Sequence, residues 1–302
     1  MSDPAHLSAA VIGLGSMGLG MARSIARAGL SLKAFDVNPQ ALEAIADVGQ
    51  GASDIISATR DCDIVVCVVV NAKQTRDVLL GPQGAVKAMK PGGVVVSCAT
   101  MSPEEARAIG AAVNEAGRLY LDAPISGGPA KAASGQMTIM ASGTRDAFSR
   151  ARPALEAMAG KIYELGDEAG IGASFKMINQ MLAGVHIAAA CEAMSFAAKL
   201  GLDLKKVFEV ITASAGNSWM FENRVPHILD GDYSPKSAVS IFTKDLGIIS
   251  DMGRSEKFPL SLSAAALQMF LMTAAAGMER DDDASVARLL AQIAGVDLPK
   301  SA

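Results

Sequence analysis

The stretch Val11-Ile12-Gly13-Leu14-Gly15-Ser16-Met17-Gly18 contains the pattern that decides the fold of the N-terminal half. An apolar run predicts a strand over Ala9–Gly13, and a helix is expected over Ser16–Ala28, so the three glycines fall on a strand–turn–helix frame. Glycine permits the tight turn, the close approach of a pyrophosphate and close helix–strand packing. The N–H groups that begin a helix attract anions. We therefore expect a dinucleotide to bind at Gly13, Leu14, Gly15, Ser16, Met17 and Gly18.

Asp36 closes the second expected strand, Ser31–Asp36, eighteen residues after Gly18. A carboxylate at this place accepts hydrogen bonds from ribose hydroxyls and repels a 2′-phosphate. The next residues, Val37-Asn38-Pro39, supply no arginine that could hold such a phosphate. The sequence therefore predicts NAD rather than NADP as the cofactor. A turn or helix N-cap role for Asp36 is the alternative, and it is compatible with the same fold.

Strands and helices are expected to alternate over the first half of the chain. Further strands are predicted at Ile64–Val70, Gly93–Ser97, Tyr120–Ala123, Met137–Ser142 and Ile162–Leu165, and helices at Pro39–Val48, Thr75–Leu80, Pro103–Ala116 and Arg145–Ala159. Such alternation is typical of βαβ units in a mostly parallel, doubly wound sheet. We expect an α/β fold whose N-terminal Rossmann domain covers residues 1–170.

Beyond Gly166 no strand pattern remains, and an all-α C-terminal domain is expected over residues 171–302. Its helices are predicted at Ser174–Leu200, Leu204–Ala213, Ser218–Leu229, Phe242–Arg254, Leu260–Ala276 and Asp283–Ala294. The stretch Met177–Cys191 is shorter than the ~20 apolar residues of a membrane span, so a buried core helix is expected. Because that helix is apolar on several faces, part of it is expected to pack on a partner subunit. The acidic run Glu279–Asp283 predicts a solvated loop and a helix N-cap.

The composition narrows the class of protein. The 302 residues carry a net charge of −4 and are 50% hydrophobic, which excludes a disordered chain and argues against nucleic acid as a partner. Met1–Leu7 has no basic residue, so no signal or transit peptide is expected. The four cysteines lack metal-ligand spacing and predict reduced, buried thiols of a cytoplasmic protein without a metal.

Two polar segments are candidates for chemistry. Asp122–Gly128 follows a predicted strand, and its two glycines after Ser126 could turn backbone N–H groups toward a carboxylate, although an ordinary turn fits equally well. Lys176 lies in an apolar helix, with Asn179 and Gln180 on the same face. A buried lysine is costly unless it is paired, so Lys176 is either functional or extends its amine to solvent.

Together these segments resemble the β-hydroxyacid dehydrogenase family, which includes 3-hydroxyisobutyrate dehydrogenase. The similar segments are Gly13–Met21, Asp122–Gly128, Gly172–Gln180 and Phe242–Gly247. The resemblance implies NAD-dependent hydride transfer from a small hydroxyacid, and a homodimer or homotetramer. It implies that Lys176 is the general base and acid, that Ser126, Gly127 and Gly128 bind the substrate carboxylate, and that Thr100 and Lys244 lie near the cofactor. Many family members have asparagine where this chain has Gln180, so either Asn179 or Gln180 could contact the substrate.

A closer resemblance within the family implies a four-carbon sugar acid as the substrate. It is carried by Val69–Ala72, Leu182–Ala189, Ala215–Arg224 and Asp230–Val239. Asn217, Ser218, Asn223 and Arg224 are then candidate substrate contacts. Trp219 and Phe221 are candidate pocket walls, or else simple core residues. His186 is expected to be a hydrogen-bonded core histidine, and His227 is expected to be exposed.

Two other functions remain compatible with the residues. The first is a dehydrogenase or reductase for another small hydroxyacid, such as tartronate semialdehyde or 3-hydroxyisobutyrate. The second is a dinucleotide-binding regulator without turnover. The second would need only the first domain, whereas this chain retains Lys176, Lys244 and Asp122–Gly128.

Overall fold

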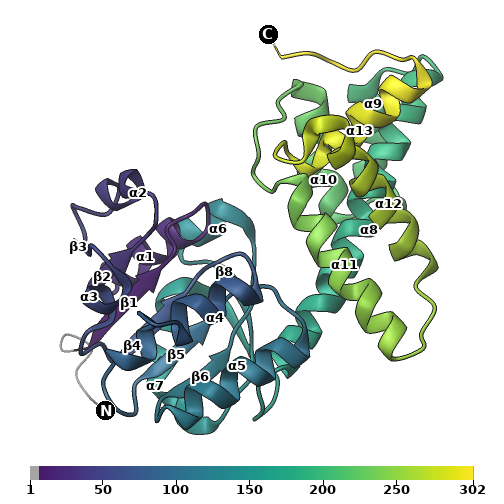
Figure 1. The fold of residues 1–302 in the computed structure, drawn as a ribbon. Coiled ribbons are helices and arrows are strands. Elements are labelled where there is room, and N and C mark those ends of the chain that lie inside the picture. The colour runs from purple at the N-terminus through teal and green to yellow at the C-terminus, as the bar shows by residue number, and fades with distance from the viewer. Residues whose placement is uncertain (1–6, 302) are drawn as a thin grey trace. The chain divides into compact units, whose positions relative to one another are not determined.

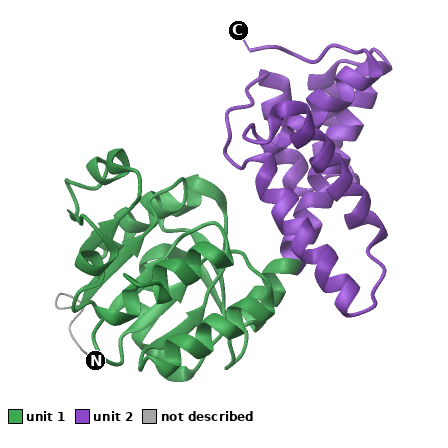
Figure 2. Ribbon diagram, viewed as in Figure 1, with its two compact units in different colours: residues 1–177 green, residues 178–302 purple. Residues whose placement is uncertain are grey.

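The protein is described by a computed structural model covering residues 7–301. The N-terminal residues 1–6, for which the sequence predicts no targeting signal, lie outside the described residues. Contacts divide the chain into two compact units, Met1–Met177 and Ile178–Ala302 (Figure 2). The division falls inside one long helix, α8 (Ile171–Lys199).

Unit 1 is built around a six-stranded sheet whose strands are all parallel, in the order β3-β2-β1-β4-β5-β6 (Figure 1). The strands are β1 (Ser8–Ile12), β2 (Ser31–Phe35), β3 (Gln50–Gly51), β4 (Ile64–Cys67), β5 (Val94–Ser97) and β6 (Leu119–Asp122). The order reverses between β1 and β4, as in a doubly wound dinucleotide-binding fold. The predicted fold class is confirmed.

Helices cover both faces of this sheet. They are α1 (Gly18–Arg27), α2 (Pro39–Glu43), α3 (Ile55–Thr59), α4 (Ala72–Leu80), α5 (Pro103–Glu115), α6 (Gly128–Ser134) and α7 (Arg145–Met158), with a 3₁₀ turn at Ala85–Lys87. Along β1, Ala9 and Val11 join one apolar core with α1 and α7, while Ala10 and Ile12 join a second core with α4 and α5. The central strands β1, β4 and β5 are therefore largely apolar, since both of their faces are buried, whereas β2 is only partly buried and β3 is exposed.

A small second sheet follows in unit 1, in the order β7-β8-β9. Its strands are β7 (Ile125–Ser126), β8 (Met137–Ala141) and β9 (Ala159–Glu164); β7 is antiparallel to β8, and β8 is parallel to β9. The sequence did not predict β3, α3, β7 or α6. Each has seven residues or fewer, so hydrophobic periodicity has too few positions to be visible.

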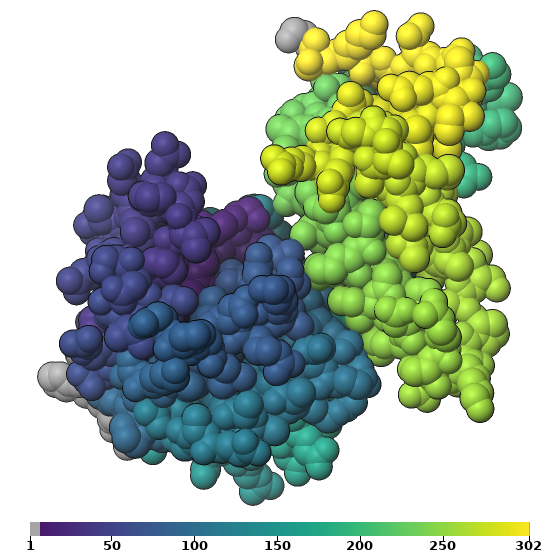
Figure 3. Space-filling model, viewed as in Figure 1, coloured from purple at the N-terminus to yellow at the C-terminus, as the bar shows by residue number. Residues whose placement is uncertain are grey.

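Unit 2 is helical, and in residues 178–301 the only strand pairing is a single bridge between Ala238 and Asp282. Its helices are the rest of α8, α9 (Leu204–Thr212), α10 (Trp219–Asp230), α11 (Val239–Ser255), α12 (Ser261–Thr273) and α13 (Val286–Ala294), with a π-helix at Ala274–Met278 and a 3₁₀ turn at Asp283–Ser285. The C-terminal segment lies along the surface of unit 2 (Figure 3). It crosses the end of α10, where a Cβ on Gly231 would lie 2.4 Å from the Ser301 nitrogen.

The sequence predicted a buried core helix in this region, but α8 is not buried on all sides. Exposed apolar side chains recur along it at Phe175, Ile178, Leu182 and Phe196, and Leu200, directly after the helix, is exposed as well. On length and composition, α8 and the helical segment Ser261–Met278 could each span a membrane, but 44% and 28% of their most apolar windows are buried within the protein. The exposed stripe on α8 is thus a face that intramolecular packing leaves open.

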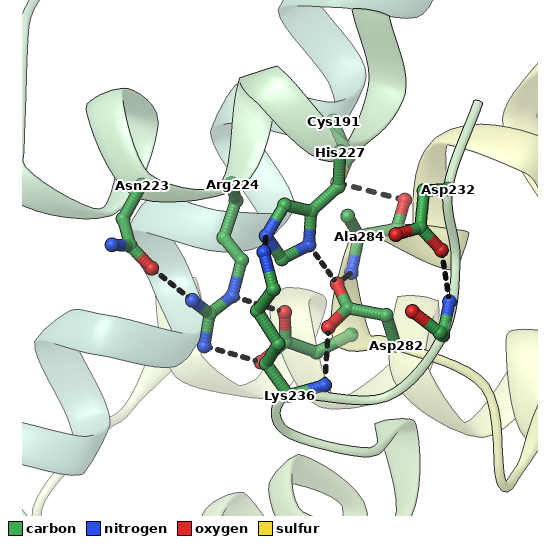
Figure 4. Close-up of polar contacts among 10 residues, drawn as sticks. Cys191, Asn223, Arg224, His227, Asp232, Lys236, Asp282 and Ala284 are labelled. Atoms are coloured by element: carbon green, nitrogen blue, oxygen red, sulfur yellow. Dashed lines mark hydrogen bonds and ion pairs between the residues drawn. The ribbon is translucent and has the colours of Figure 1, made fainter. Parts of the chain in front are cut away.

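A buried ion pair joins α10 to the turn before α13 (Figure 4). Arg224 donates through Nε to Asp283 Oδ1 at 2.5 Å and through Nη2 to Oδ2 at 3.1 Å, and its Nη1 donates to Asn223. The Asp283 side chain is inaccessible to solvent. The expectation that Glu279–Asp283 is solvated is therefore wrong for its last two residues, Asp282 and Asp283. The expected N-cap is present, because Asp282 accepts from the Ala284 amide.

His227 lies in the same cluster and is buried, so its expected exposure is wrong (Figure 4). Its Nδ1 lies 2.8 Å from Asp282 Oδ1, and Lys236 Nζ lies 3.1 Å from its Nε2. The Lys236 amide also donates to Asp282 Oδ2 at 3.1 Å. These contacts hold the loop after α10 against the turn that contains Asp282. A single sequence could not show the contacts of Asp282, because its partners His227 and Lys236 lie 55 and 46 residues away.

The substitution Asp283→Asn should destabilise the protein by about 3–5 kcal/mol, because it leaves the buried charge of Arg224 without its partner. Urea denaturation at pH 7.5 measures the free energy of unfolding. The control Asp251→Asn removes the exposed partner of Arg254 and should cost less than about 1 kcal/mol. Equal and small losses in both variants would contradict the structural role of the buried pair.

Candidate active site

The glycine turn between β1 and α1 is closed by backbone contacts that leave no room for side chains. A Cβ on Gly13, whose φ is +96°, would lie 2.2 Å from the Val68 carbonyl oxygen. A Cβ on Gly18 would lie 1.9 Å from the Gly13 carbonyl oxygen. The Gly13 amide donates to the Phe35 carbonyl at 2.9 Å, which joins the turn to the end of β2. Two of the three glycines are therefore required by the protein itself.

Gly15 differs from the other two, because a Cβ there would meet no heavy atom within 4 Å among the described residues. Its backbone thus faces open space beside the start of α1, where Met17, the N-cap, makes no side-chain capping bond. This arrangement fits a pyrophosphate lying across Gly15, with the N-terminal amides of α1 as donors. The structure offers no competing reason for a glycine at this position.

Asp36 supports the same turn from the end of β2. Its Oδ2 accepts from the Leu14 amide at 2.6 Å and its Oδ1 accepts from the Asn38 amide at 2.7 Å. An ionised carboxylate has about four acceptor positions, so two bonds leave capacity for ribose hydroxyls. The turn role that the sequence kept as an alternative is therefore present, and the ribose contact stays a prediction.

The Ser126–Gly128 loop is the connection from β7 to α6: Ser126 ends β7, Gly127 is the N-cap of α6, and Gly128 is the first residue of α6. Gly127 and Gly128 have φ values of +140° and +77°, a region that other residues rarely adopt. The following helix α6 packs directly on α1: a Cβ on Gly20 would lie 2.6 Å from the Ala133 nitrogen. The dinucleotide turn and the predicted carboxylate loop thus belong to one rigid assembly within unit 1.

Lys176 lies in the first turns of α8 and is only 6% exposed, so it does not extend its amine freely into solvent. Thr100 follows β5 by three residues, after the buried Cys98 and Ala99, at the carboxyl edge of the sheet. Ligands of open α/β sheets bind at this edge. Both positions are compatible with the roles that the family resemblance implies, and these roles stay predictions.

In unit 2 a chain of polar contacts joins α8 to α11. Asn179 Nδ2 donates to Gln180 Oε1 at 3.0 Å, and Gln180 Nε2 donates to Asp245 Oδ2 at 2.5 Å. Lys244 Nζ donates to Asp245 Oδ1 at 2.5 Å. Asp245 is fully buried. Its carboxylate therefore orients both the Gln180 amide and the Lys244 amine. Asn179 and Lys244 are the two ends of this series of hydrogen bonds.

The segment Asn217–Arg224 is largely structural in this unit. Asn217 donates to the Thr212 carbonyl and to Glu222, and Ser218 caps α10 by accepting from the Phe221 amide. Phe221 is buried and stacks on Phe208 with a centroid separation of 5.9 Å. Trp219 is 56% exposed. Trp219 and Asn223 are the exposed candidates of this segment for contact with substrate, and Asn223 already accepts a hydrogen bond from Arg224.

The described part of the chain has no cluster of metal-ligating side chains, and its cysteines are buried. Residues 7–301 contain no group of three or more His, Cys, Asp or Glu side chains placed to hold a metal ion. The cysteines Cys62, Cys67, Cys98 and Cys191 are buried and unpaired, as predicted. Burial raises the pKa of the Cys67 thiol to about 12, so it stays protonated at neutral pH.

The substitution Gly15→Ala should leave the free energy of unfolding within about 0.5 kcal/mol of the parent, because the new methyl group meets no protein atom. It should raise the Kd for NAD⁺ at least tenfold if the pyrophosphate crosses this residue. Calorimetric titration measures that Kd. Gly216→Ala, at another unobstructed glycine, is the matched control and should change neither quantity. Unchanged NAD⁺ binding by Gly15→Ala would refute the placement.

Comparison with known proteins identifies both halves of the chain. Residues 8–166 match the NAD-binding domain of 6-phosphogluconate dehydrogenase. Residues 170–290 match the family described as the NAD-binding domain of NADP-dependent 3-hydroxyisobutyrate dehydrogenase. The two matched regions meet within four residues of each other, near the start of α8.

Full-length relatives agree with these matches. An L-threonate dehydrogenase of Cupriavidus necator is 53% identical over 97% of this chain and 98% of that protein. An L-threonate dehydrogenase of Escherichia coli K12 is 44% identical over 99% of both. The crystal structure of a 3-hydroxyisobutyrate dehydrogenase from Salmonella typhimurium superposes with a TM-score of 0.90 at 46% identity, covering 94% of this chain and 99% of that one. The glycine turn, the parallel sheet and these matches together place the chain in the β-hydroxyacid dehydrogenase family, as an oxidoreductase that uses NAD.

Proposed function

We propose that the protein oxidises L-threonate to 2-oxotetronate with NAD⁺, as a step in the breakdown of four-carbon sugar acids. The observation that carries this proposal is the 53% identity over nearly the whole length of an L-threonate dehydrogenase. Four further L-threonate dehydrogenases are 44–48% identical over 98–99% of the chain. Substrates of this class carry a carboxylate and several hydroxyls, so they require a polar site.

In the proposed mechanism, Lys176 takes the proton of the substrate C2 hydroxyl. The bound NAD⁺ supplies the acceptor for the hydride that leaves the same carbon. Lys176 suits this role because it is nearly buried at the start of α8. Its ammonium form then returns the proton when the reaction runs in reverse. The groups that hold NAD⁺ are Gly13, Leu14, Gly15, Ser16, Met17, Gly18 and Asp36, with Thr100 and Lys244 near the nicotinamide.

Substrate orientation is assigned to two groups of residues. Ser126, Gly127 and Gly128 hold the carboxylate, since successive amides beside two left-handed glycines can converge on one anion. Asn179 and Gln180 contact the substrate hydroxyls, and Asp245 fixes the Gln180 amide for this purpose. In this proposal residues 1–170 serve NAD binding and also supply the Ser126–Gly128 loop, whereas residues 171–302 serve substrate binding and association between subunits.

We also propose that the protein is a homodimer or homotetramer in the cytoplasm. The exposed stripe of Phe175, Ile178, Leu182 and Phe196 on α8, continued by Leu200 after the helix, supports association, because exposed apolar faces of this length usually pack on a partner. The buried, unpaired cysteines are typical of a reducing compartment.

A dehydrogenase for 3-hydroxyisobutyrate is the second candidate. The observation in its favour is the 46% identity to the Salmonella typhimurium protein that bears this name. Both candidates share the carboxylate, the hydroxyl and the lysine chemistry, and they differ in the number of hydroxyls that the pocket must satisfy.

The substrate assay is the reduction of NAD⁺ by purified protein with L-threonate, D-threonate, D-erythronate, D-glycerate or 3-hydroxyisobutyrate, repeated with NADP⁺. We expect kcat/KM for L-threonate with NAD⁺ to exceed every other combination at least tenfold. A preference for NAD⁺ follows from the Asp36 carboxylate, which repels a 2′-phosphate. Highest activity with 3-hydroxyisobutyrate would favour the second candidate.

The substitution Lys176→Ala should lower kcat by ~10²–10⁴-fold, the usual contribution of a general acid or base. The Kd for NAD⁺ should stay within about twofold, because the glycine turn is unaltered. Lys199→Ala is the control on the same helix: its amine donates to the Ala294 carbonyl, and its kcat should not change. Near-normal turnover by Lys176→Ala would assign the proton transfer to another group.

A further inference from the structure

Asp122 is a buried carboxylate at the end of β6 whose partners are the first amides of α8. Its Oδ2 accepts from the Gly170 amide at 2.9 Å and from the Ala173 amide at 2.8 Å. The side chain is only 1% exposed. The N-terminal N–H groups of a helix have no partner inside the helix, so a carboxylate there replaces the missing acceptors.

Ser142, in the bridge beside Asp122, completes this contact. Its Oγ accepts from the Gly172 amide at 2.9 Å, and its backbone exchanges both hydrogen bonds with Asp122. A Cβ on Gly172 would lie 2.4 Å from the Met140 carbonyl oxygen and 2.9 Å from the Asp122 carbonyl oxygen. The first turn of α8 therefore packs directly on the strand ends, and three hydrogen bonds to the Asp122 and Ser142 side chains hold it there.

This contact lies between the two parts of the proposed site that unit 1 contains. Ala173, which donates to Asp122, precedes Lys176 by three residues and so lies on the same face of α8. On the other side, Asp122 precedes the loop Ser126–Gly128 by four residues. One carboxylate thus connects the backbone that carries Lys176 to the end of β6, four residues before Ser126.

Burial of the Asp122 carboxylate costs free energy of folding, which is unexpected for a residue that serves only stability. Burial raises the pKa of Asp122 to about 6, even though the amides of Ala173 and Gly170 and the Ser142 hydroxyl act in the opposite direction. The folded environment therefore disfavours the ionised form compared with water. Buried carboxylates with a shifted pKa are found most often at functional sites.

We propose that Asp122 is a positioning residue: its hydrogen bonds to the Gly170 and Ala173 amides fix Lys176 at the distance from the Ser126–Gly128 loop that proton transfer requires. The residue does not touch the reacting atoms. Its effect on the rate follows from geometry, since a displacement of about 1 Å at a catalytic group can cost ~10²-fold in rate. The inference rests on the proposed function of Lys176.

The test compares Asp122→Ala with Asp122→Asn in the full-length protein. Alanine removes the oxygen that accepts from both amides, and kcat with L-threonate should fall at least thirtyfold, while KM and the Kd for NAD⁺ change less than threefold. Asparagine retains a carbonyl oxygen that can accept from both amides, so Asp122→Asn should keep kcat within about fivefold of the parent. A split between kcat and KM, together with this rescue, distinguishes positioning from general destabilisation.

Asp203→Ala is the matched control for the loss of a helix cap. Asp203 accepts from the Lys205 and Lys206 amides at the start of α9, and its removal should lower the melting temperature without changing kcat. If Asp122→Ala does not fold, Ser142→Ala takes its place. It removes the acceptor for Gly172 and the hydroxyl that acts on Asp122, but leaves the Asp122 bonds to the Gly170 and Ala173 amides, and kcat should then fall about tenfold.

The outcomes separate this inference from the function on which it rests. If Lys176→Ala abolishes turnover but Asp122→Ala loses only melting temperature, Asp122 is merely a structural cap and the inference is overturned. If Asp122→Asn is as inactive as Asp122→Ala, charge and not hydrogen bonding matters, which also overturns it. If the parent protein does not oxidise L-threonate, the proposed function is wrong. If Lys176→Ala remains active, the proposed role of Lys176 is wrong, and the inference about Asp122 is wrong with it.

Discussion

The structure of unit 1 depends on a backbone approach that only glycine allows. The turn after β1 brings Gly18 against the Gly13 carbonyl and Gly13 against the carbonyl of Val68 at the end of β4. Any side chain at either position would separate α1 from the sheet at the point where the strand order reverses. The same approach leaves Gly15 facing open space. A steric requirement of the fold thus creates the place where a dinucleotide can bind.

Buried carboxylates join segments that lie far apart in the sequence. Asp122 holds the start of α8, Asp245 holds Gln180 and Lys244, and Asp283 holds Arg224. Each replaces water by amide, amine or guanidinium donors, which makes its burial tolerable. The three serve different ends: two lie beside residues with proposed chemical roles, whereas the Arg224 pair lies within the helical core of unit 2.

The long helix α8 has to satisfy several demands at once. Its first turn is hydrogen-bonded to the end of β6 through Asp122. Its polar residues Lys176 and Gln180 are nearly buried, whereas apolar residues such as Phe196 are exposed. A helix that is apolar on most sides cannot show from its sequence which side faces the rest of its own chain. That choice is made by the helices packed against it, and the remaining face stays exposed.

The sequence by itself determined the parallel sheet, the helical second half, the NAD turn and the family, because glycine spacing and hydrophobic periodicity are local signals. It did not show the short elements β3, α3, β7 and α6, or the burial of His227 and Asp282. It also suggested Arg224 as a substrate contact, whereas Arg224 is paired with Asp283. The short elements have too few residues to show a hydrophobic period. The burial and pairing of the polar groups were decided by tertiary structure, since the partner of each lies about 50 residues away or more and only folding brings the two together.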